Sequence, residues 1–423
     1  MEELDYEEPE KKEKTKGSFA KGVLIGAGGM LFVGIAVLFL AVNLMGRHIV
    51  IAPSGEETKK SALSDQTLAK INELIGYIHL YYYDDVEEET LAEGIYSGLL
   101  AGLDDKYTEY YTAREYEDLQ ISATQKYYGI GASLLQDKES MQVTIKHVYE
   151  GSPAEEAGLM DGDMIVTVGD IEATSMELSD LVTHIRGEEG TDVHLQIYRE
   201  GDTDYREYDV KRANIDLPTV ESKMLDEKTG YVHILDFGAP TVRQFEEAVE
   251  KLAGQGMQAM IIDVRDNPGG MITSVTGVLD DILPEGTVVY TEDKYGKRQD
   301  YTSDDEKKMD YPLAVLINSN SASASEILAG AIRDFDYGTL IGATTFGKGV
   351  VQSILGLSEG DAIKLTTAKY FTPKGENIHG SGIAPDIELK YEYSGDKEGE
   401  YEELKDNQVL KAMEVLNEEI STQ

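Results

Sequence analysis

The sequence contains no cysteine, and basic side chains are scarce in it. Without cysteine there is no disulfide framework, no thiolate zinc site and no thiol nucleophile. The seven histidines never form an HExxH-type pair, so we expect no metal site and no other cofactor. With 38 basic against 80 acidic residues the formal net charge is −42, which argues against nucleic acid as a partner because two polyanions repel each other.

What the chain does have is length and apolar content. Its 423 residues leave room for two or three domains, and 41% hydrophobic residues are enough to build their cores. The excess of acidic side chains is typical of a solvated surface and of charged tails.

One segment, from Gly22 to Gly46, carries no charged residue. A helix of this length, rising about 1.5 Å per residue, spans a hydrocarbon core of about 30 Å. Five lysines precede the segment within residues 11–21, and Arg47 alone follows it directly. This bias predicts a single-pass anchor in the cell membrane, with a cytoplasmic N-terminus and everything after residue 46 outside the cytoplasm. The alternative is a cleaved signal peptide, whose apolar stretch is usually shorter and ends in an A-x-A exit.

The rest of the chain changes its apolar spacing twice. The spacing is helical from 62 to 120, then shows short alternating strands to 213, and then strands alternating with helices to about 390, which is typical of an α/β core. We therefore expect a mixed α/β protein divided into a tail (1–21), the anchor (22–46), a tether (47–61), a helical region (62–120), a β-rich domain (121–213), an α/β core (214–395) and a C-terminal helix (396–423).

The β-rich domain carries a fairly specific pair of strings, YYGIGASLL and YEGSPAEEAGLMDGDMIVTVGDIEA, which together resemble a PDZ domain. In such domains a glycine-rich turn presents consecutive backbone N–H groups that suit a chain-terminal carboxylate, and the peptide adds as a strand. The matching positions are Gly129, Ile130 and Gly131, although GIG is also compatible with a simple hairpin entry. Arg186, at the end of the bordering helix, could sense a bound peptide or could be a solvated helix-end arginine.

Four serines separated by single residues lie in the stretch NSNSASASEILAGAIRD, after the buried-strand pattern PLAVLIN. Apolar residues then recur at helical spacing, so a helix begins among the serines. Ser323 and Glu326 fit the S-x-x-E capping box, which explains Ser323 as an N-cap. A serine at such a strand-to-helix turn also projects its hydroxyl beside the free N–H groups of the helix, which favour an oxyanion, so a nucleophile is the second interpretation.

A nucleophilic serine needs a base, and the sequence offers two. Lys348 could act as a base if burial lowers its pKa, and Gln352 could contact it across a helical turn but not along a strand. His379 could instead join Asp386 in a Ser-His-Asp arrangement. A rival reading takes the GxxxxGK string at 342–348 as a phosphate-binding loop, although glycine follows it where Ser or Thr would hold magnesium.

The strings VLINSNSASASEILAGAIRD, IIDVRDNPGGM, GATTFGKGVVQ and IHGSGIAPDIEL resemble the C-terminal processing peptidases, the tail-specific Ser/Lys proteases of peptidase family S41. The resemblance covers about residues 65–415 and implies a core like that of crotonase and ClpP, with the PDZ domain inserted before it. It implies Ser323 as nucleophile, Lys348 as general base and Gln352 as the residue that orients the lysine. It further implies the backbone N–H groups of Gly270 and Ala324 as oxyanion donors.

Other positions of the resemblance are less specific. Glu326, Asp334, Arg265 and Thr345 match positions that the family uses, and each is compatible with support of the site or with ordinary packing. Family members usually show Asp-Pro-Tyr-Ser in the helical region, whereas this chain has Asp105-Lys106-Tyr107-Thr108. We expect that departure to affect the local turn and not catalysis.

The resemblance implies a membrane-anchored endopeptidase that acts outside the cytoplasm on proteins with unstructured C-terminal tails. The PDZ domain would capture the tail and gate the site, cleavage would pass through an acyl-enzyme, and the terminal helices would pair two chains into a homodimer. A different class is a membrane-tethered PDZ scaffold without chemistry, which need not retain Ser323, Lys348 and Gln352 together. An acyl-transferring enzyme on the same core shape is a third class, but a small acyl substrate offers no chain end for a PDZ domain.

Overall fold

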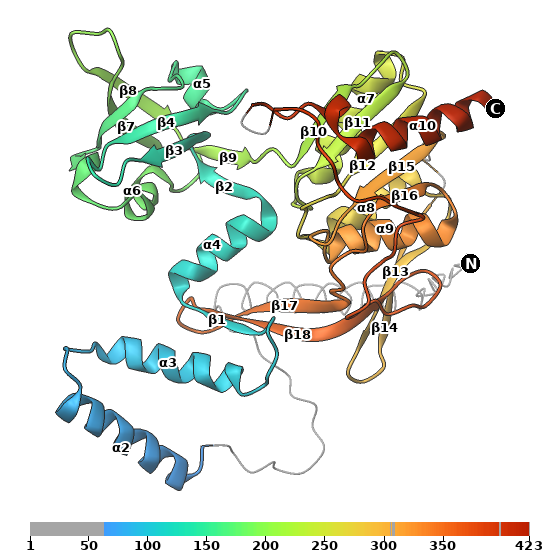
Figure 1. Cartoon of the computed structure of the whole chain (residues 1–423). Coiled ribbons are helices and arrows are strands. Elements are labelled where there is room, and N and C mark those ends of the chain that lie inside the picture. Colours follow the sequence, from blue (N-terminus) through green and yellow to red (C-terminus); the bar gives the residue numbers. More distant parts are fainter. Residues whose placement is uncertain (1–62, 305, 307–308, 397–398, 423) are drawn as a thin grey trace, which may run out of the picture. The chain divides into compact units, whose positions relative to one another are not determined.

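The computed structural model describes residues 63–304, 306, 309–396 and 399–422, which fall into two compact units (Figure 1). The first unit holds the residues up to Ile95 together with Gly356–Gly360, and the second holds Tyr96–Leu355 and Asp361 onward. The predicted tail, anchor and tether lie outside the described residues. Among the described helices none has the length and apolar character needed to cross a membrane.

The first unit is helical, as its apolar spacing predicts. Helix α2 (Asp65–Tyr81) has Ser64 as its N-cap, whose side chain accepts a hydrogen bond from the Thr67 N–H. Helix α3 (Glu88–Ala101) follows after a short turn, and its last residues, from Tyr96 on, belong to the second unit. Neither helix has a buried residue, and large apolar side chains remain exposed along both. The most exposed of these are Leu74, Tyr77, Leu80, Tyr81 and Leu99.

In the second unit, α4 (Ala113–Thr124) leads into a β domain with the expected PDZ pattern. Its main sheet has the strand order β3-β4-β5-β7-β8, with β6 on β5, and β2 pairs separately with β9. The strands are β2 (Lys126–Gly129), β3 (Ala132–Gln136), β4 (Val143–Val148), β5 (Met164–Val168), β6 (Ile171–Glu172), β7 (Asp192–Tyr198), β8 (Arg206–Lys211) and β9 (Ala213–Asp216). Two helices, α5 (Pro153–Ala157) and α6 (Leu178–Ile185), complete the domain around one apolar core.

The α/β core is built on a six-stranded sheet. Its order is β10-β11-β12-β15-β16-β19, with β10 antiparallel to β11 and all later pairs parallel. The strands are β10 (Val220–Met224), β11 (Thr229–Ile234), β12 (Ala259–Asp263), β15 (Leu313–Ile317), β16 (Thr339–Gly342) and β19 (Ile387–Glu388). The helices are α7 (Thr241–Gly254), α8 (Ile272–Ile282), α9 (Ala324–Phe335) and α10 (Asn407–Thr422).

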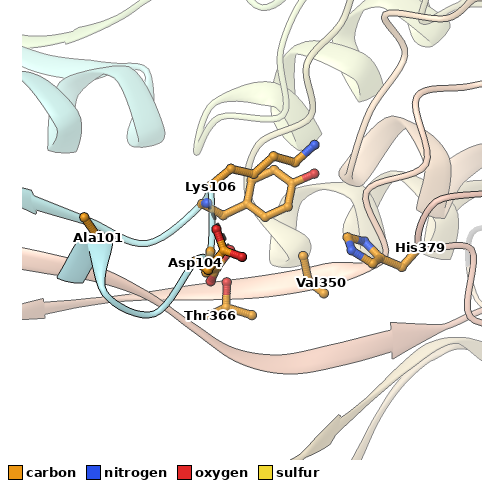
Figure 2. A pocket seen from close by; sticks show the side chains of 8 residues that line it. Ala101, Asp104, Lys106, Val350, Thr366 and His379 are labelled. Carbon is orange, nitrogen blue, oxygen red and sulfur yellow. Dashed lines mark hydrogen bonds between the residues drawn. The ribbon is translucent and has the colours of Figure 1, made fainter.

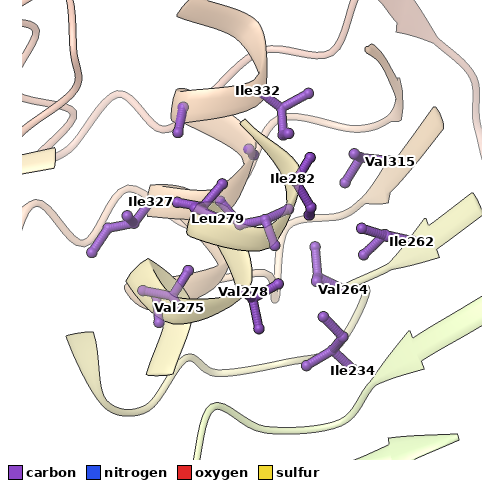
Figure 3. Packing of buried hydrophobic residues seen from close by; sticks show 14 of the residues in the cluster. Ile234, Ile262, Val264, Val275, Val278, Leu279, Ile282, Val315, Ile327 and Ile332 are labelled. Carbon is purple, nitrogen blue, oxygen red and sulfur yellow. The ribbon is translucent and has the colours of Figure 1, made fainter. Parts of the chain in front are cut away.

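Both faces of this sheet are covered, so its central strands β12 and β15 are buried at every position. Ile262 and Val315 pack toward α8 and α9, where Figure 3 shows them opposite Leu279. Their neighbours Ile261 and Leu316 belong to a separate cluster with α10. Because successive side chains of a strand point to opposite faces, a strand buried on both sides reads as a run of apolar residues, which is how AMII and LAVLI appear in the sequence.

The core also contains a second, five-stranded sheet. Its order is β1-β18-β13-β14, and β17 pairs with β18. The strands are β1 (Glu109–Tyr111), β13 (Gly286–Asp293), β14 (Arg298–Ser303), β17 (Val350–Gly356) and β18 (Ala362–Phe371). Strand β1 follows the Asp105–Thr108 segment directly, so its pairing with β18 holds that segment against the core.

Candidate active site

Ser323 lies between β15 and α9 and is the N-cap of that helix, as the capping-box pattern predicts. Its backbone has φ of 54° and ψ of −111°, a conformation that residues other than glycine rarely adopt. The flanking serines hold the loop: the Ser321 hydroxyl donates to the Val264 carbonyl at 2.7 Å, and the Ser325 hydroxyl donates to the Asn267 carbonyl at 3.0 Å. These bonds give Ser321 and Ser325 a structural role, and they fix Ser323 in a strained turn.

Glu326 is fully buried and joins the serine turn to the lysine loop. Its Oε2 atom accepts from the Ser323 N–H at 2.9 Å and from the Lys348 N–H at 2.8 Å. Its Oε1 atom accepts from the Thr345 hydroxyl at 2.6 Å and from the Gly347 N–H at 2.7 Å. One carboxylate therefore binds the backbones of both predicted catalytic residues, and four donors compensate for its burial.

Lys348 lies in the loop between β16 and β17 and is half-buried. Burial lowers the pKa of its amine below the ordinary value, the positive charges of Lys364 and Lys106 lower it further, and Glu326 opposes them. The amine lies 5.1 Å from the centre of the Tyr107 ring. An amine in this environment can be neutral at a pH at which an exposed lysine would be charged, which is what a general base needs.

The helical turn proposed between Lys348 and Gln352 is wrong. Lys348 precedes β17, and Gln352 lies on that strand because β17 pairs with β18. The Gln352 amide donates to the Thr366 hydroxyl on β18 at 3.2 Å. The argument that placed the amide one helical turn from the lysine therefore does not hold.

The DNPGG loop runs against the serine turn. The Asn267 amide donates to the Ile234 carbonyl at 2.8 Å, and Asn267 Oδ1 accepts from the Gly269 N–H at 2.8 Å. Gly269 has φ of 115°, and a Cβ atom on it would lie 2.7 Å from the Cβ of Ser323. Gly270 follows at φ of 135°, and Ala324 is the first residue of α9, where backbone N–H groups have no partner within the helix.

An acidic side chain also lies beside this loop. A Cβ atom on Gly270 would be 3.0 Å from Asp236 Oδ1, which is buried without a hydrogen-bond partner among the described residues. Burial raises the pKa of the Asp236 carboxyl to about 6, with a smaller opposing effect of the Phe237 N–H. Nothing in the sequence pattern singles this residue out.

The remaining supporting positions divide between the site and the scaffold. Thr345 binds Glu326 directly and also accepts from the Ile383 N–H at 2.7 Å. Arg265 lies in a buried ionic cluster with Asp263 and Asp406, beneath α10. Asp334 pairs with Arg333 near the end of α9, far along the helix from Ser323.

In the PDZ domain the predicted carboxylate loop lies between β2 and β3. Gly129 ends β2, Ile130 is buried in the domain core, and Gly131 has φ of 79°, a backbone conformation that favours glycine. Arg186 is the C-cap of α6, and its guanidinium lies 5.5 Å from the Tyr127 ring at the start of the loop. Burial raises the pKa of Tyr127 to about 12, while the charge of Arg186 and the N–H groups of Gly131 and Ala132 act in the opposite direction.

The rival bases and the phosphate loop find no support in the structure. His379 Nδ1 accepts from the Gly349 N–H at 3.4 Å, whereas Asp386 accepts from the Leu340 N–H at 2.8 Å on β16. The GxxxxGK string leads into strand β17, while a phosphate-binding loop of that kind leads into a helix. Within the part of the chain that the structure describes, no three His, Cys, Asp or Glu side chains converge as a metal site.

Three residues near the lysine were missed in the sequence. Tyr107 faces the Lys348 amine, Lys364 on β18 lowers its pKa, and the Tyr370 hydroxyl donates to the Ser323 carbonyl at 3.3 Å. None of these side chains lies within the motifs themselves, and Tyr107 comes from a distant part of the chain, so the pairing of β18 with β1 and β17 is what brings them there. The one signal for them in the sequence is the Asp105–Thr108 string, whose departure from the family string predicts an effect on the local turn and not on catalysis.

Three family descriptions match successive parts of the chain: the N-terminal domain of the activating protease CtpB over residues 23–115, the PDZ domain over 144–199 and peptidase family S41 over 228–389. The carboxy-terminal processing protease CtpB of Bacillus subtilis (strain 168) is 34% identical over 372 residues, which cover 87% of this chain and 77% of that protein. The chain belongs to peptidase family S41. This S41 chain is also 37% identical over 292 residues, 68% of either protein, to the carboxyl-terminal-processing protease of Synechocystis sp..

Among solved structures, the photosystem II D1 C-terminal processing protease is 28% identical, with a TM-score of 0.44, over 77% of this chain and 87% of that one. The sequence relatives suffice for the assignment: this S41 member is a serine-type C-terminal processing peptidase with a PDZ domain.

Proposed function

We propose that this S41 peptidase cleaves with Ser323 as nucleophile and Lys348 as general base. The observation that carries the proposal is the shared Glu326 oxygen, which accepts from the backbone N–H groups of both residues. Gln352 is proposed as a positioning residue, supported by its bond to Thr366 on the strand that also carries Lys364.

In this mechanism the neutral Lys348 amine takes the proton of the Ser323 hydroxyl while Oγ attacks the peptide carbonyl carbon. The oxyanion accepts from the N–H groups of Gly270 and Ala324, each such donor being worth about 10² to 10³ in rate. The lysine ammonium then gives its proton to the leaving amine, and an acyl-enzyme remains. Water, deprotonated by the same amine, attacks the ester and releases the new C-terminus.

The test uses the full chain with a protein substrate that ends in an unstructured tail. Ser323→Ala and Lys348→Ala should each lower kcat by about 10⁴ or more while circular dichroism and the unfolding midpoint stay near wild type. Lys374→Ala, at an exposed lysine of the same core, is the matched control and should keep wild-type kcat. Cleavage near the wild-type rate by Lys348→Ala would exclude lysine as the base.

We propose further that the PDZ domain captures the C-terminal tail of the substrate. The supporting features are the glycine-rich loop at Gly129–Gly131 and the adjacent Arg186 guanidinium, which together offer N–H donors and positive charge to a carboxylate. A substrate with a free terminal carboxylate should show a KM at least tenfold lower than the same substrate ending in an amide. Equal KM values for the two substrates would remove carboxylate capture from the mechanism.

We also propose a single-pass anchor over residues 22–46, which would contact membrane lipid and place the protease outside the cytoplasm, and a homodimer formed through the terminal helices. The anchor rests on the uncharged run and the preceding lysines. The dimer is supported by the exposed apolar side chains of α2, such as Leu74, Tyr77 and Leu80. Sedimentation of residues 47–423 should show a dimer that Leu74→Glu converts to monomer, and a wild-type monomer would contradict the pairing.

A further inference from the structure

The Asp105–Thr108 segment, which departs from the usual family string, lies at the catalytic lysine. Its Tyr107 ring is approached by two amines: Lys348 Nζ lies 5.1 Å from the ring centre and Lys106 Nζ lies 4.8 Å from it. Lys106 Nζ is also 5.2 Å from the centre of the Phe346 ring, in the loop that carries Lys348. Figure 2 shows Lys106 in the pocket that Val350, Thr366 and His379 also line.

Hydrogen bonds within the Asp105–Thr108 segment, and from it to β18, hold its backbone in place beside Lys348. Asp105 accepts from the Tyr107 N–H at 3.0 Å and from the Thr108 hydroxyl at 2.8 Å. The same hydroxyl accepts from the Thr366 N–H on β18 at 3.2 Å, and Thr366 in turn accepts from Gln352. These bonds fix the backbone of the turn to the strands that flank Lys348, so the fold determines where the Lys106 side chain begins, and its amine contacts the Tyr107 and Phe346 rings.

A charge at this position affects how easily Lys348 holds a proton. A cation is attracted to the face of an aromatic ring, and two cations at one ring repel each other. The Lys348 amine is affected by the charges of Lys364 on β18, Glu326 on α9 and Lys106 in the turn, and it lies against the Tyr107 ring. Three further titratable groups surround Tyr107: Asp105 in the turn, Tyr370 on β18 and His379 in the loop after β18. Of the two further lysines, Lys364 is engaged by Glu109 and Tyr111, whereas Lys106 is exposed and contacts the same ring as the base.

We propose that Lys106 is a positioning residue for this protease, which competes with Lys348 for the Tyr107 ring and so keeps the Lys348 amine free to take the Ser323 proton. The proposal rests on the function assigned to Lys348 above. The positive charges of Lys106 and Lys364 act in the same direction as burial, each lowering the pKa of Lys348. Proline, the usual residue at position 106 in the family string, has no charge with which to do this.

The test is the pH dependence of kcat/KM for the full chain with a C-terminal-tail peptide. The rate rises with pH as Lys348 loses its proton, so removing a neighbouring positive charge moves this rise to higher pH. Lys106→Met should shift it upward by about half a pH unit, since the charge is partly screened, and lower kcat/KM about threefold on the rising limb. Lys106→Arg, which keeps the charge, should retain the wild-type profile.

Salt and a distant lysine provide the controls. In 1 M salt, where the Debye length is about 3 Å, the Lys106→Met and wild-type profiles should converge, which loss of a packing role would not produce. Lys138→Met, at an exposed lysine in the PDZ domain, should leave the profile unchanged. Coincident wild-type and Lys106→Met profiles at low salt, or an equal shift in Lys106→Arg, would overturn the proposal.

Lys348→Ala belongs in the same series because it separates the two proposals. If Lys348→Ala is inactive and Lys106→Met is unshifted, the general base stands and the role of Lys106 fails. If Lys348→Ala stays active, the assignment of the base itself fails, whatever the profile of Lys106→Met.

Discussion

At the scale of single residues, the site depends on a serine in a rare backbone conformation. A residue other than glycine at positive φ costs about 1–3 kcal/mol and persists only where its surroundings impose it. For Ser323 those surroundings are Glu326 on one side and the DNPGG loop on the other, where the Asn267 carbonyl accepts from the Ala322 N–H at 3.1 Å. The turn is therefore only as stable as the buried carboxylate beside it.

Glu326→Gln tests that dependence. An amide keeps the shape but offers one acceptor oxygen in place of two, so at least one of the four donors loses its partner. We expect the free energy of unfolding to fall by about 1–3 kcal/mol and kcat by about 10² as Ser323 and Lys348 lose their alignment. Denaturant unfolding and steady-state kinetics measure both quantities; Glu250→Gln, exposed on α7, should change neither, and wild-type kcat in Glu326→Gln would contradict this view.

Asp236 should make the folded state less stable as the pH rises, which is the reverse of the usual effect of a carboxyl group. Its folded-state pKa of about 6 lies above its ordinary value of 3.8, so the unfolded chain loses this proton first as the pH rises. This carboxyl therefore favours folding most below pH 4, and its contribution is lost between about pH 4 and 6. Asp236→Asn should thus unfold at a higher temperature than wild type at pH 7, with no such difference near pH 4.

Asp266, whose carboxyl pKa is lowered and not raised, serves as the control for Asp236. Hydrogen bonds from Asn320 and Asn318 lower the pKa of Asp266, so this group stabilises the fold at neutral pH and loses that effect as the pH falls. Asp266→Asn should therefore destabilise the protein at pH 7. If the two variants shift the melting temperature in the same direction at pH 7, the assignment for Asp236 is wrong.

At the scale of elements, the sequence predicts the helix starts and buried strands that depend on neighbouring residues. It does not predict conformations that depend on pairing with a distant strand. The S-x-x-E string predicts the start of α9, and the run PLAVLIN predicts β15, because capping and burial depend on neighbouring residues. The Lys348–Gln352 turn was wrong because β17 takes its conformation from β18. No local pattern reveals that Tyr107 reaches the base.

Helix α10 offers an element-scale prediction. Arg265 donates to Asp406 at 2.7 Å and to Gln408 at 2.8 Å, and both acceptors are buried at the start of this helix. Asp406→Ala would leave the arginine charge buried without one partner, so we expect a loss of about 3–5 kcal/mol in the free energy of unfolding. Glu414→Ala, which removes an exposed pair with Lys411, should cost no more than about 1 kcal/mol, and equal losses in the two variants would contradict a buried cluster.

At the scale of the whole molecule, the sequence combines an acidic chain with one uncharged run. A formal charge of −42 does not favour binding to anionic lipid, so membrane attachment would have to come from residues 22–46. Expressed in a bacterial host, the full chain should sediment with membranes and resist extraction by 1 M salt, whereas a chain lacking residues 1–46 should stay in the supernatant. Release of the full chain by salt alone would contradict a spanning anchor.

The oxygen shared by the Ser323 and Lys348 backbones also limits how this enzyme can be adjusted. Because one atom joins the two loops, neither can drift without the other, and the spacing of their main chains is effectively a constant of the architecture. The charges around the Lys348 amine can still vary, because side chains such as Lys106 come from a separate segment of the chain. Exchanging a surface residue such as Lys106 would therefore change the pH at which the proposed base loses its proton, while the backbones of Ser323 and Lys348 keep their spacing.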